Sequence, residues 1–225
     1  MNFSSDVSGR TALIAGGVSG IGAAASLAFK RHGARVIACG LTDDEIATAR
    51  ADQAFAGIDL RKLDVTNAGA VSTMVSGLAS LDFVVNSAGM IRRDAEHDPA
   101  VFDQVMNVNV SGGMRVASAA RPLLKASKGS IIFIASIMSF FGGPKQPAYS
   151  ASKGAVRNLT QSLAAAYAAD GIRVNAVAPG WVMTNLSRGA REDTARNAMI
   201  MSRTPMGRWA DTGEIADPIM FLCSD

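Results

Sequence analysis

A tyrosine and a lysine stand four positions apart in the stretch YSASKGAV, as Tyr149 and Lys153. Residues at this spacing lie on one face of a helix, so Lys153 can reach toward Tyr149. A free phenol titrates near ~10 and is a poor base at neutral pH, but a nearby positive charge lowers its pKa. The pair predicts a proton-transfer device acting on a carbonyl or hydroxyl group. By itself it is a weak signal, because such pairs also arise by chance on solvated helix faces.

Two more polar residues have types that suit the same chemistry. Ser136 ends the apolar run GSIIFIAS ahead of Tyr149, and its hydroxyl can hold a substrate oxygen and stabilise charge developing on it. Asn109, in MNVNVSGG, falls in a segment with helical spacing, where asparagine is not favoured. Taken alone, Ser136 is equally well explained as an ordinary strand-end hydroxyl.

A glycine-rich turn follows the first apolar run, in AGGVSGIGAAASLAF. Gly16, Gly20 and Gly22 fall where a strand gives way to a helix. Missing side chains there permit a tight turn, and the free N–H groups and positive dipole end of the helix can face a diphosphate. This position predicts a dinucleotide site. The alternative is a tight turn that binds nothing.

Short apolar runs alternate with helical segments along the chain, and they must position these residues. Strands are expected at 11–16, 35–39, 58–65, 81–89, 129–136 and 172–180, and the clearest helices at 20–32, 100–126 and 148–169. This alternation predicts an α/β fold with a doubly wound parallel sheet and helices on both faces. No linker-like stretch divides the chain, so we expect one domain over residues 1–225.

Composition excludes several function classes. The formal charge is only +3 and the basic residues are scattered, so no nucleic-acid-binding stripe is expected. No apolar run approaches membrane-spanning length, so no membrane association is expected. Cys39 and Cys223 are far apart and outside any Cys-x-x-Cys pair, which argues against a disulfide scaffold or a metal site and favours a cytoplasmic location.

Taken in order, these motifs resemble the classical short-chain dehydrogenase/reductase family. The family's turn reads Thr-Gly-x-x-x-Gly-x-Gly, and Ala15 replaces its threonine, which should loosen the turn slightly. The resemblance implies a Rossmann-like fold and an NAD(P)-dependent oxidoreductase that interconverts a secondary alcohol and a ketone. It also implies catalytic roles: Tyr149 as acid or base, Lys153 as its activator and a ribose contact, Ser136 on the substrate oxygen, and Asn109 in a proton relay through water.

The resemblance further implies a set of cofactor contacts spread over several motifs. NSAG, at 86–89, is similar to the family's Asn-Asn-Ala-Gly, and PGWVMT, at 179–184, is similar to its Pro-Gly motif. The implied contacts are Gly16, Ser19, Gly20, Ile21, Gly22, Gly40, Leu41, Asp64, Val65, Asn86, Ala88, Gly89, Tyr149, Lys153, Pro179, Gly180, Val182 and Thr184.

The choice between NAD and NADP depends on the residues after the second expected strand. Gly40 and Leu41 are neutral, as is Ser19, whereas Asp43 and Asp44 follow closely and would repel an extra phosphate. We therefore expect NAD, with NADP as the alternative. The two aspartates are equally well explained as the start of a helix.

Two regions are candidates for substrate selection. Arg92 and Arg93, in AGMIRR, could bind a carboxylate in a two-pronged contact, although solvated loop arginines are an equally good interpretation. By resemblance, 185–209 forms a mobile lid in which Met199, Met201 and Met206 line a pocket or simply pack a core. The arginines favour a sugar-derived hydroxy or keto acid as the small-molecule substrate. The alternatives are a 3-ketoacyl-thioester reductase and a non-catalytic cofactor sensor.

The resemblance breaks at the end of the sequence. The family adds another strand after its final helix, whereas this chain stops at FLCSD. Either the sheet keeps an exposed edge, which is a liability, or a tail is missing. A homo-oligomer, dimer or tetramer, remains the expectation from the resemblance.

Overall fold

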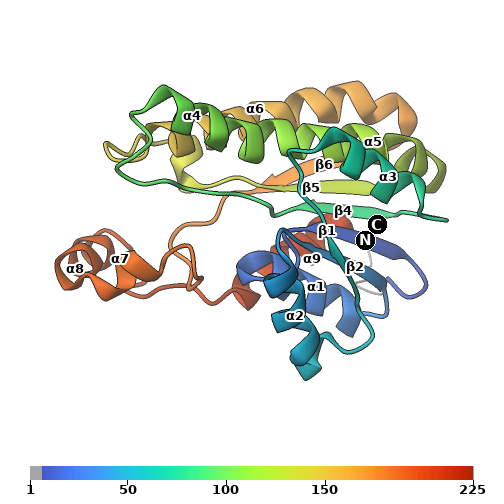
Figure 1. Cartoon of the computed structure of the whole chain (residues 1–225), viewed down its shortest axis with the longest axis horizontal. Coiled ribbons are helices and arrows are strands. Elements are labelled where there is room, and N and C mark those ends of the chain that lie inside the picture. Colours follow the sequence, from blue (N-terminus) through green and yellow to red (C-terminus); the bar gives the residue numbers. More distant parts are fainter. Residues whose placement is uncertain (1–6, 225) are drawn as a thin grey trace.

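Within residues 7–224, which the computed structural model describes, six parallel strands form one sheet (Figure 1). They are β1 (Thr11–Ala15), β2 (Arg35–Gly40), β3 (Asp59–Lys62), β4 (Phe83–Asn86), β5 (Ser130–Ile134) and β6 (Arg173–Val177). Their order is β3-β2-β1-β4-β5-β6, so the chain builds outward from β1 and then returns to the centre. Sheets of this kind bind ligands beyond the carboxyl ends of their strands, where the order reverses between β1 and β4.

Helices cover both faces of the sheet (Figure 1). One face carries α1 (Gly20–Arg31), α2 (Asp43–Ala51) and α9 (Gly213–Cys223), and the other carries α3 (Ala68–Ser76), α4 (Pro99–Met106), α5 (Gly113–Ser127) and α6 (Pro147–Tyr167). In β1, Leu13 joins the apolar core under α3, α5 and α6, while Ile14 joins the core under α1 and α9. Because both faces are buried, β1, β4 and β5 are buried along their whole length, whereas the edge strand β3 is partly exposed and mostly charged. The predicted doubly wound sheet is confirmed.

The segment expected to be one helix at 100–126 is interrupted. The helices α4 and α5 are joined by a π-helical turn, η2 (Asn107–Gly112), which widens the coil. Such turns often occur at functional sites. Short 3₁₀ turns complete the backbone at η1 (Gln53–Phe55), η3 (Ile137–Ser139) and η4 (Ala168–Asp170).

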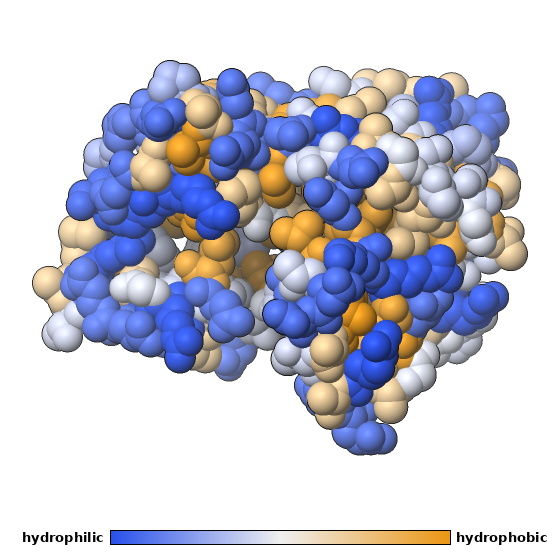
Figure 2. Space-filling model, in the orientation of Figure 1, coloured by the Kyte–Doolittle hydropathy of each residue, from blue (hydrophilic) through white to orange (hydrophobic). Residues whose placement is uncertain are grey.

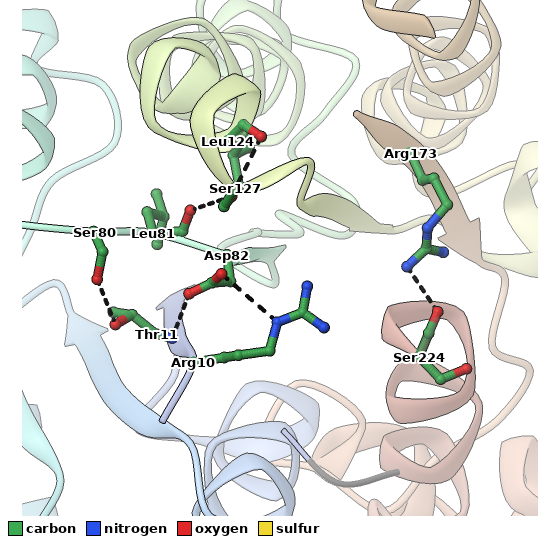
Figure 3. A network of polar contacts seen from close by, with 9 residues as sticks. All are labelled: Arg10, Thr11, Ser80, Leu81, Asp82, Leu124, Ser127, Arg173 and Ser224. Carbon is green, nitrogen blue, oxygen red and sulfur yellow. Dashed lines mark hydrogen bonds and ion pairs between the residues drawn. The ribbon is translucent and has the colours of Figure 1, made fainter. Parts of the chain in front are cut away.

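A polar network fastens the amino ends of the central strands (Figure 3). The Asp82 carboxylate accepts the backbone N–H of Thr11 at 2.8 Å and lies 3.6 Å from the Arg10 guanidinium. At the sheet edge, Arg173 donates to the backbone carbonyl of Ser224 at 2.9 Å, joining β6 to the end of α9. These contacts fix β1, β4 and β6 at the end of the sheet opposite to their carboxyl ends.

One segment stands away from the sheet. Residues 185–209, which we call the α7–α8 segment, carry α7 (Arg188–Glu192) and α8 (Thr194–Ser202) (Figure 1). The segment is flanked by a bridge between Val182 and Ala210, in which Met183 N–H donates to the Ala210 carbonyl at 2.9 Å. Both ends of the segment therefore leave the body at one place.

Residues 7–224 show neither a membrane-spanning helix nor a metal-binding cluster. No helix among them is long and apolar enough to cross a membrane. They also hold no cluster of three or more His, Cys, Asp or Glu side chains arranged to bind a metal ion. Both cysteines, Cys39 and Cys223, are buried and free.

Candidate active site

A cavity of about 990 Å³ runs along the carboxyl ends of the strands. It extends from the glycine turn after β1 to the start of α6, and the α7–α8 segment closes one side. On the face seen in Figure 2, the molecule is hollowed between this segment and the body, and apolar side chains are visible in the hollow. Several predicted cofactor residues line the cavity: Gly16, Ser19, Gly20, Ile21, Gly40, Leu41, Asp64, Val65, Ala88, Gly89, Pro179, Gly180, Val182 and Thr184.

The glycine turn has the form of a phosphate cradle. Gly16 has φ +72°, and a Cβ there would lie 2.7 Å from the backbone nitrogen of Ala88. A Cβ on Gly22 would clash with the Gly16 carbonyl oxygen, so this glycine packs α1 against the turn and does not line the cavity. Ser19, the N-cap of α1, makes no side-chain cap bond, which leaves the helix N-terminus facing the cavity. These residues fit a dinucleotide diphosphate.

The turn is supported despite the missing threonine. Ser26 on α1 is fully buried and donates its hydroxyl to the Gly17 carbonyl at 2.8 Å. The Gly17 N–H in turn donates to the Cys39 carbonyl on β2 at 2.8 Å. A hydroxyl from the helix thus holds the turn, so the expected loosening at Ala15 has a local compensation.

Beside the glycine turn, at the end of β2, the cavity carries a carboxylate that sequence reasoning missed. Glu45 accepts the Leu41 N–H at 2.6 Å, and its carboxylate lies 3.2 Å from where a Gly40 Cβ would be. It forms a capping box with Thr42, the N-cap of α2. Of the two aspartates considered, Asp44 lines the cavity, whereas Asp43 pairs with Lys62 on the surface. The pattern Thr-x-x-Glu at 42–45 could have revealed the fold-back of Glu45.

Three of the four expected catalytic side chains meet in the cavity. Ser136, Tyr149 and Lys153 all line it, and the Ser136 hydroxyl lies near enough to the Tyr149 phenol to act on its pKa. Lys153 donates its ammonium to the Ile134 carbonyl at 2.6 Å and lies 5.5 Å from the centre of the Tyr149 ring. The serine, phenol and ammonium therefore converge at the carboxyl end of β5.

The electrostatics of this group differ from expectation. Burial raises the pKa of Tyr149, the Ser136 hydroxyl opposes that rise, and the negative charge of Glu96 adds to it. Lys153 was expected to lower the pKa of this phenol, but its ammonium is directed to a backbone carbonyl. Burial lowers the pKa of Lys153 itself to about 8.

Asn109, the fourth expected catalytic residue, is buried and does not line the cavity. It is buried in η2, where its side chain accepts from the Met90 N–H at 2.7 Å and donates to the Met90 carbonyl at 3.0 Å. It also donates to the Ser152 hydroxyl at 2.9 Å. Its oxygen lies 3.4 Å from where a Gly89 Cβ would be. Asn109 therefore joins the strand-end turn after β4 to the helix that carries Lys153, while Asn107 faces outward and binds Arg115.

A buried carboxylate connects the loop that carries Arg92 and Arg93, which we call the arginine loop, to α6, the helix that carries Tyr149 and Lys153. Glu96 is 1% exposed; one of its oxygens accepts the Arg92 N–H at 2.8 Å and the other accepts the Tyr149 N–H at 2.7 Å. Arg92 lines the cavity. Arg93 does not: its guanidinium donates to Gln146 at 3.3 Å and lies 3.6 Å from Asp94.

Known proteins match this chain over nearly its whole length. A family model described as enoyl-(acyl carrier protein) reductase matches residues 15–225. A 2-dehydro-3-deoxy-D-gluconate 5-dehydrogenase from Bacillus subtilis is 37% identical over 223 residues, covering 96% of this chain and 88% of that protein. A 3-oxoacyl-[acyl-carrier-protein] reductase from Thermotoga maritima is 34% identical, covering 96% and 91%. The chain belongs to the short-chain dehydrogenase/reductase family.

Solved structures of this family agree in fold. A gluconate 5-dehydrogenase from Burkholderia cenocepacia, in complex with NADP and tartrate, superposes with a TM-score of 0.89 at 31% identity, covering 98% of this chain and 90% of that one. This short-chain dehydrogenase/reductase is thus an NAD(P)-dependent oxidoreductase that transfers hydride between the cofactor and a secondary alcohol or ketone.

Several expected site residues of this short-chain dehydrogenase/reductase do not line the cavity. Asn86 is buried at the end of β4 with both polar side-chain atoms unpartnered, and only the residues after it reach the cavity. The three lid methionines are also absent from the lining: Met199 and Met206 are exposed, and Met201 borders a separate surface hollow. The lining residues of the α7–α8 segment include Leu186, Ala190 and Arg196. Sequence spacing cannot tell which face of so short a helix turns inward.

Proposed function

We propose that Tyr149 is the proton donor and acceptor, Ser136 positions the substrate oxygen, and Lys153 and Asn109 support them. The bound nicotinamide supplies or accepts the hydride. During alcohol oxidation the Tyr149 phenolate removes the hydroxyl proton, and during ketone reduction the phenol returns it. The Ser136 hydroxyl, which lines the cavity beside the phenol, holds the same oxygen and stabilises its developing charge. Lys153, whose ammonium donates to the Ile134 carbonyl in this structure, would contact the cofactor ribose and activate the phenol when the cofactor is bound.

We propose that the substrate is a sugar-derived hydroxy acid or its keto form. The observation that carries this is the Glu96 bridge, which fixes the Arg92 backbone to the backbone of Tyr149. The bridge holds the backbone of Arg92, whose side chain lines the cavity, beside the backbone of the catalytic tyrosine, and this arrangement suits a substrate whose carboxylate lies a few bonds from its reacting carbon. Relatives that act on 2-dehydro-3-deoxy-D-gluconate and gluconate support the same class.

A 3-ketoacyl-thioester reductase is the second candidate, supported by the similarity to the Thermotoga maritima reductase. A turnover screen separates the two. Sugar acids, their keto derivatives and 3-ketoacyl thioesters are each assayed with NAD(H) and with NADP(H). We expect the highest kcat/KM for a sugar acid. Preferential turnover of ketoacyl thioesters, or of uncharged alcohols, contradicts the proposal.

We also propose that NAD is preferred over NADP. Glu45 occupies the Leu41 N–H at the end of β2, where an added 2′-phosphate would need hydrogen-bond donors. Its negative charge, with that of Asp44 beside it, repels a phosphate and suits a ribose hydroxyl. Comparison of kcat/KM for the two cofactors tests this preference.

The proposal includes one catalytic domain over residues 1–225, with the α7–α8 segment as a substrate cover, assembled as a dimer or tetramer in the cytoplasm. β6 is an edge strand of the described sheet, and exposed edges are usually covered. The free, buried cysteines suit a reducing compartment. Light scattering of the purified protein measures the oligomeric state, and a monomeric mass contradicts that part.

A further inference from the structure

Arg196 brings a second cavity-lining guanidinium to the site, from the opposite side to Arg92. It lies in the first turn of α8, where its backbone N–H donates to the N-cap Asp193 at 3.0 Å. Its side chain is partly buried and lines the same cavity as Arg92 and Tyr149. Within residues 7–224, neither Arg92 nor Arg196 forms an ion pair with an acidic side chain. Neither of these cavity-lining cations is thus held in a direct ion pair by the protein.

Arg196 lines the cavity together with Gln146, Arg92 and Tyr149, and its electrostatic neighbours lie on the loop that carries Arg92 and Arg93. Gln146 is the N-cap of the helix that carries Tyr149, and it lines the cavity and accepts from the Arg93 guanidinium at 3.3 Å. Arg93 in turn acts on Arg196: burial lowers the pKa of Arg196 first, and the positive charge of Arg93 lowers it further. The nearby carboxylates, Asp193 and Asp94, only partly offset these effects. Arg196 therefore faces the arginine loop and not the glycine turn.

Positive groups gathered around one end of a cavity favour an anionic ligand. Like charges on two separate segments repel, and this repulsion disappears when an anion lies between them. A guanidinium binds a carboxylate through two parallel N–H donors, and two guanidinium groups from opposite sides can share one carboxylate. A neutral alcohol would leave both cations unpaired.

We propose that Arg196 and Arg92 together bind the carboxylate of the substrate, so that the substrate's own charge draws the α7–α8 segment over the cavity. This rests on the proposed function, because it needs a carboxylated substrate. It assigns a specificity role to a residue of α8 that the sequence did not single out. In this arrangement a hydroxy acid is preferred over a neutral alcohol because only the acid joins the two segments.

The chain carries a natural reporter of this event. Both of its tryptophans lie at the base of the segment: the Trp181 and Trp209 rings are in edge contact, with centroids 5.4 Å apart. Trp209 donates its indole N–H at 2.8 Å to Asn197, the neighbour of Arg196 on α8. A shift of α8 toward the cavity changes the surroundings of these rings, so their fluorescence follows anion binding without turnover.

The test compares Arg196→Gln with the wild type and with Arg203→Gln. Arg203 is the exposed C-cap of the same helix and does not line the cavity. The control variant Arg203→Gln therefore removes the same charge at a position outside the site. The NAD⁺-loaded enzyme is titrated with tartrate, a hydroxy dicarboxylate, while tryptophan fluorescence and competitive inhibition are recorded. For Arg196→Gln we expect about tenfold or greater weakening of tartrate affinity, the loss of one charge-assisted contact. Arg203→Gln should bind as the wild type does.

Kinetics provide the second readout. Arg196 binds a part of the substrate that does not react, so Arg196→Gln should raise KM for a sugar acid more than it lowers kcat. Its kcat/KM for an uncharged secondary alcohol should fall far less than its kcat/KM for the acid, and Arg196→Lys should recover part of the affinity for the acid.

The outcomes separate the two proposals. If the wild type turns over sugar acids but Arg196→Gln keeps wild-type tartrate affinity and KM, the Arg196 assignment is wrong and the proposed function stands. A wild type that prefers uncharged substrates and is not inhibited by tartrate overturns both. Circular dichroism and NADH binding verify that each variant folds, and Arg196→Lys replaces the glutamine variant if that one does not.

Discussion

Glu96 and Tyr149 are joined by a hydrogen bond of 2.7 Å, in which the carboxylate of a loop accepts the backbone N–H of the catalytic helix. This contact has two consequences for the site. It fixes the start of α6 relative to the loop that carries Arg92, and it places a buried negative charge near the phenol, whose pKa it raises. A residue outside the expected tetrad thus influences both the geometry and the titration of the site.

The change Glu96→Gln should therefore shift the pH profile. Because the negative charge is removed, the pKa of Tyr149 should fall, and the acidic limb of kcat/KM for alcohol oxidation, which follows formation of the phenolate, should move to lower pH. The amide can accept at only one of the two positions, so the free energy of unfolding should drop by about 1–3 kcal/mol. pH–rate profiles and denaturant unfolding measure the two effects. A loss of stability without any shift of the profile would limit Glu96 to a structural role.

The change Tyr149→Phe should abolish turnover and preserve cofactor binding. General acid–base catalysis contributes about 10²–10⁴-fold, and the phenyl ring cannot exchange a proton. NADH binding, followed by fluorescence, should match the wild type. The chain's other tyrosine provides the control: Tyr167 is buried at the far end of α6 against Arg121, and Tyr167→Phe should remain active. Normal activity in Tyr149→Phe would contradict the assigned mechanism.

The change Lys153→Met should reveal a pH-dependent stability effect. The pKa of Lys153 in the folded protein is about 8, below its ordinary 10.5. Between these values the unfolded chain binds more protons, so raising the pH through this range stabilises the fold. From pH 7.5 to 9.5 the wild type should gain roughly 2 kcal/mol in free energy of unfolding relative to Lys153→Met.

Denaturant unfolding of both proteins at the two pH values measures this difference. Burial raises the pKa of Cys39 and of Cys223 equally in both proteins. The contribution of these thiols to the pH dependence of the free energy of unfolding therefore cancels in the difference. A constant difference would mean that the ammonium titrates normally despite its burial.

The change Glu45→Gln should relax the discrimination against NADP. Glutamine also completes a capping box, so α2 should keep its start while the negative charge is lost. We expect kcat/KM for NADP to rise about tenfold relative to NAD, as about 1.4 kcal/mol of repulsion is removed. The control is Asp43→Asn, which removes an equal charge from a surface pair with Lys62. Equal effects of the two changes would point to general electrostatics and not to Glu45.

The sequence predicted what depends on local pattern. The central strands were predicted because both faces of the sheet are buried there, which makes a strand such as β1 a continuous apolar run. The glycine turn and the Tyr149–Lys153 pair were recognisable because their chemistry fixes their spacing. The cavity brings Tyr149, Lys153 and Ser136 together, as the spacing indicated.

What the sequence did not predict depends on contacts between distant segments. Arg92 and Arg93 are adjacent, yet only Arg92 lines the cavity, because Gln146 holds the side chain of its neighbour. Glu96 stood unremarked in a polar loop, since its two partners belong to different segments. Arg196 gave no sequence signal, because α8 is too short for its inward face to be read from periodicity.

The bridge between Val182 and Ala210 gives the enzyme a modular architecture. The α7–α8 segment leaves the body of the protein and returns to it at the same place. Its length and composition can therefore change without disturbing the strands or α6. Exchanging the α7–α8 segment between homologues should therefore transfer substrate preference, while proton transfer by Tyr149 is unchanged.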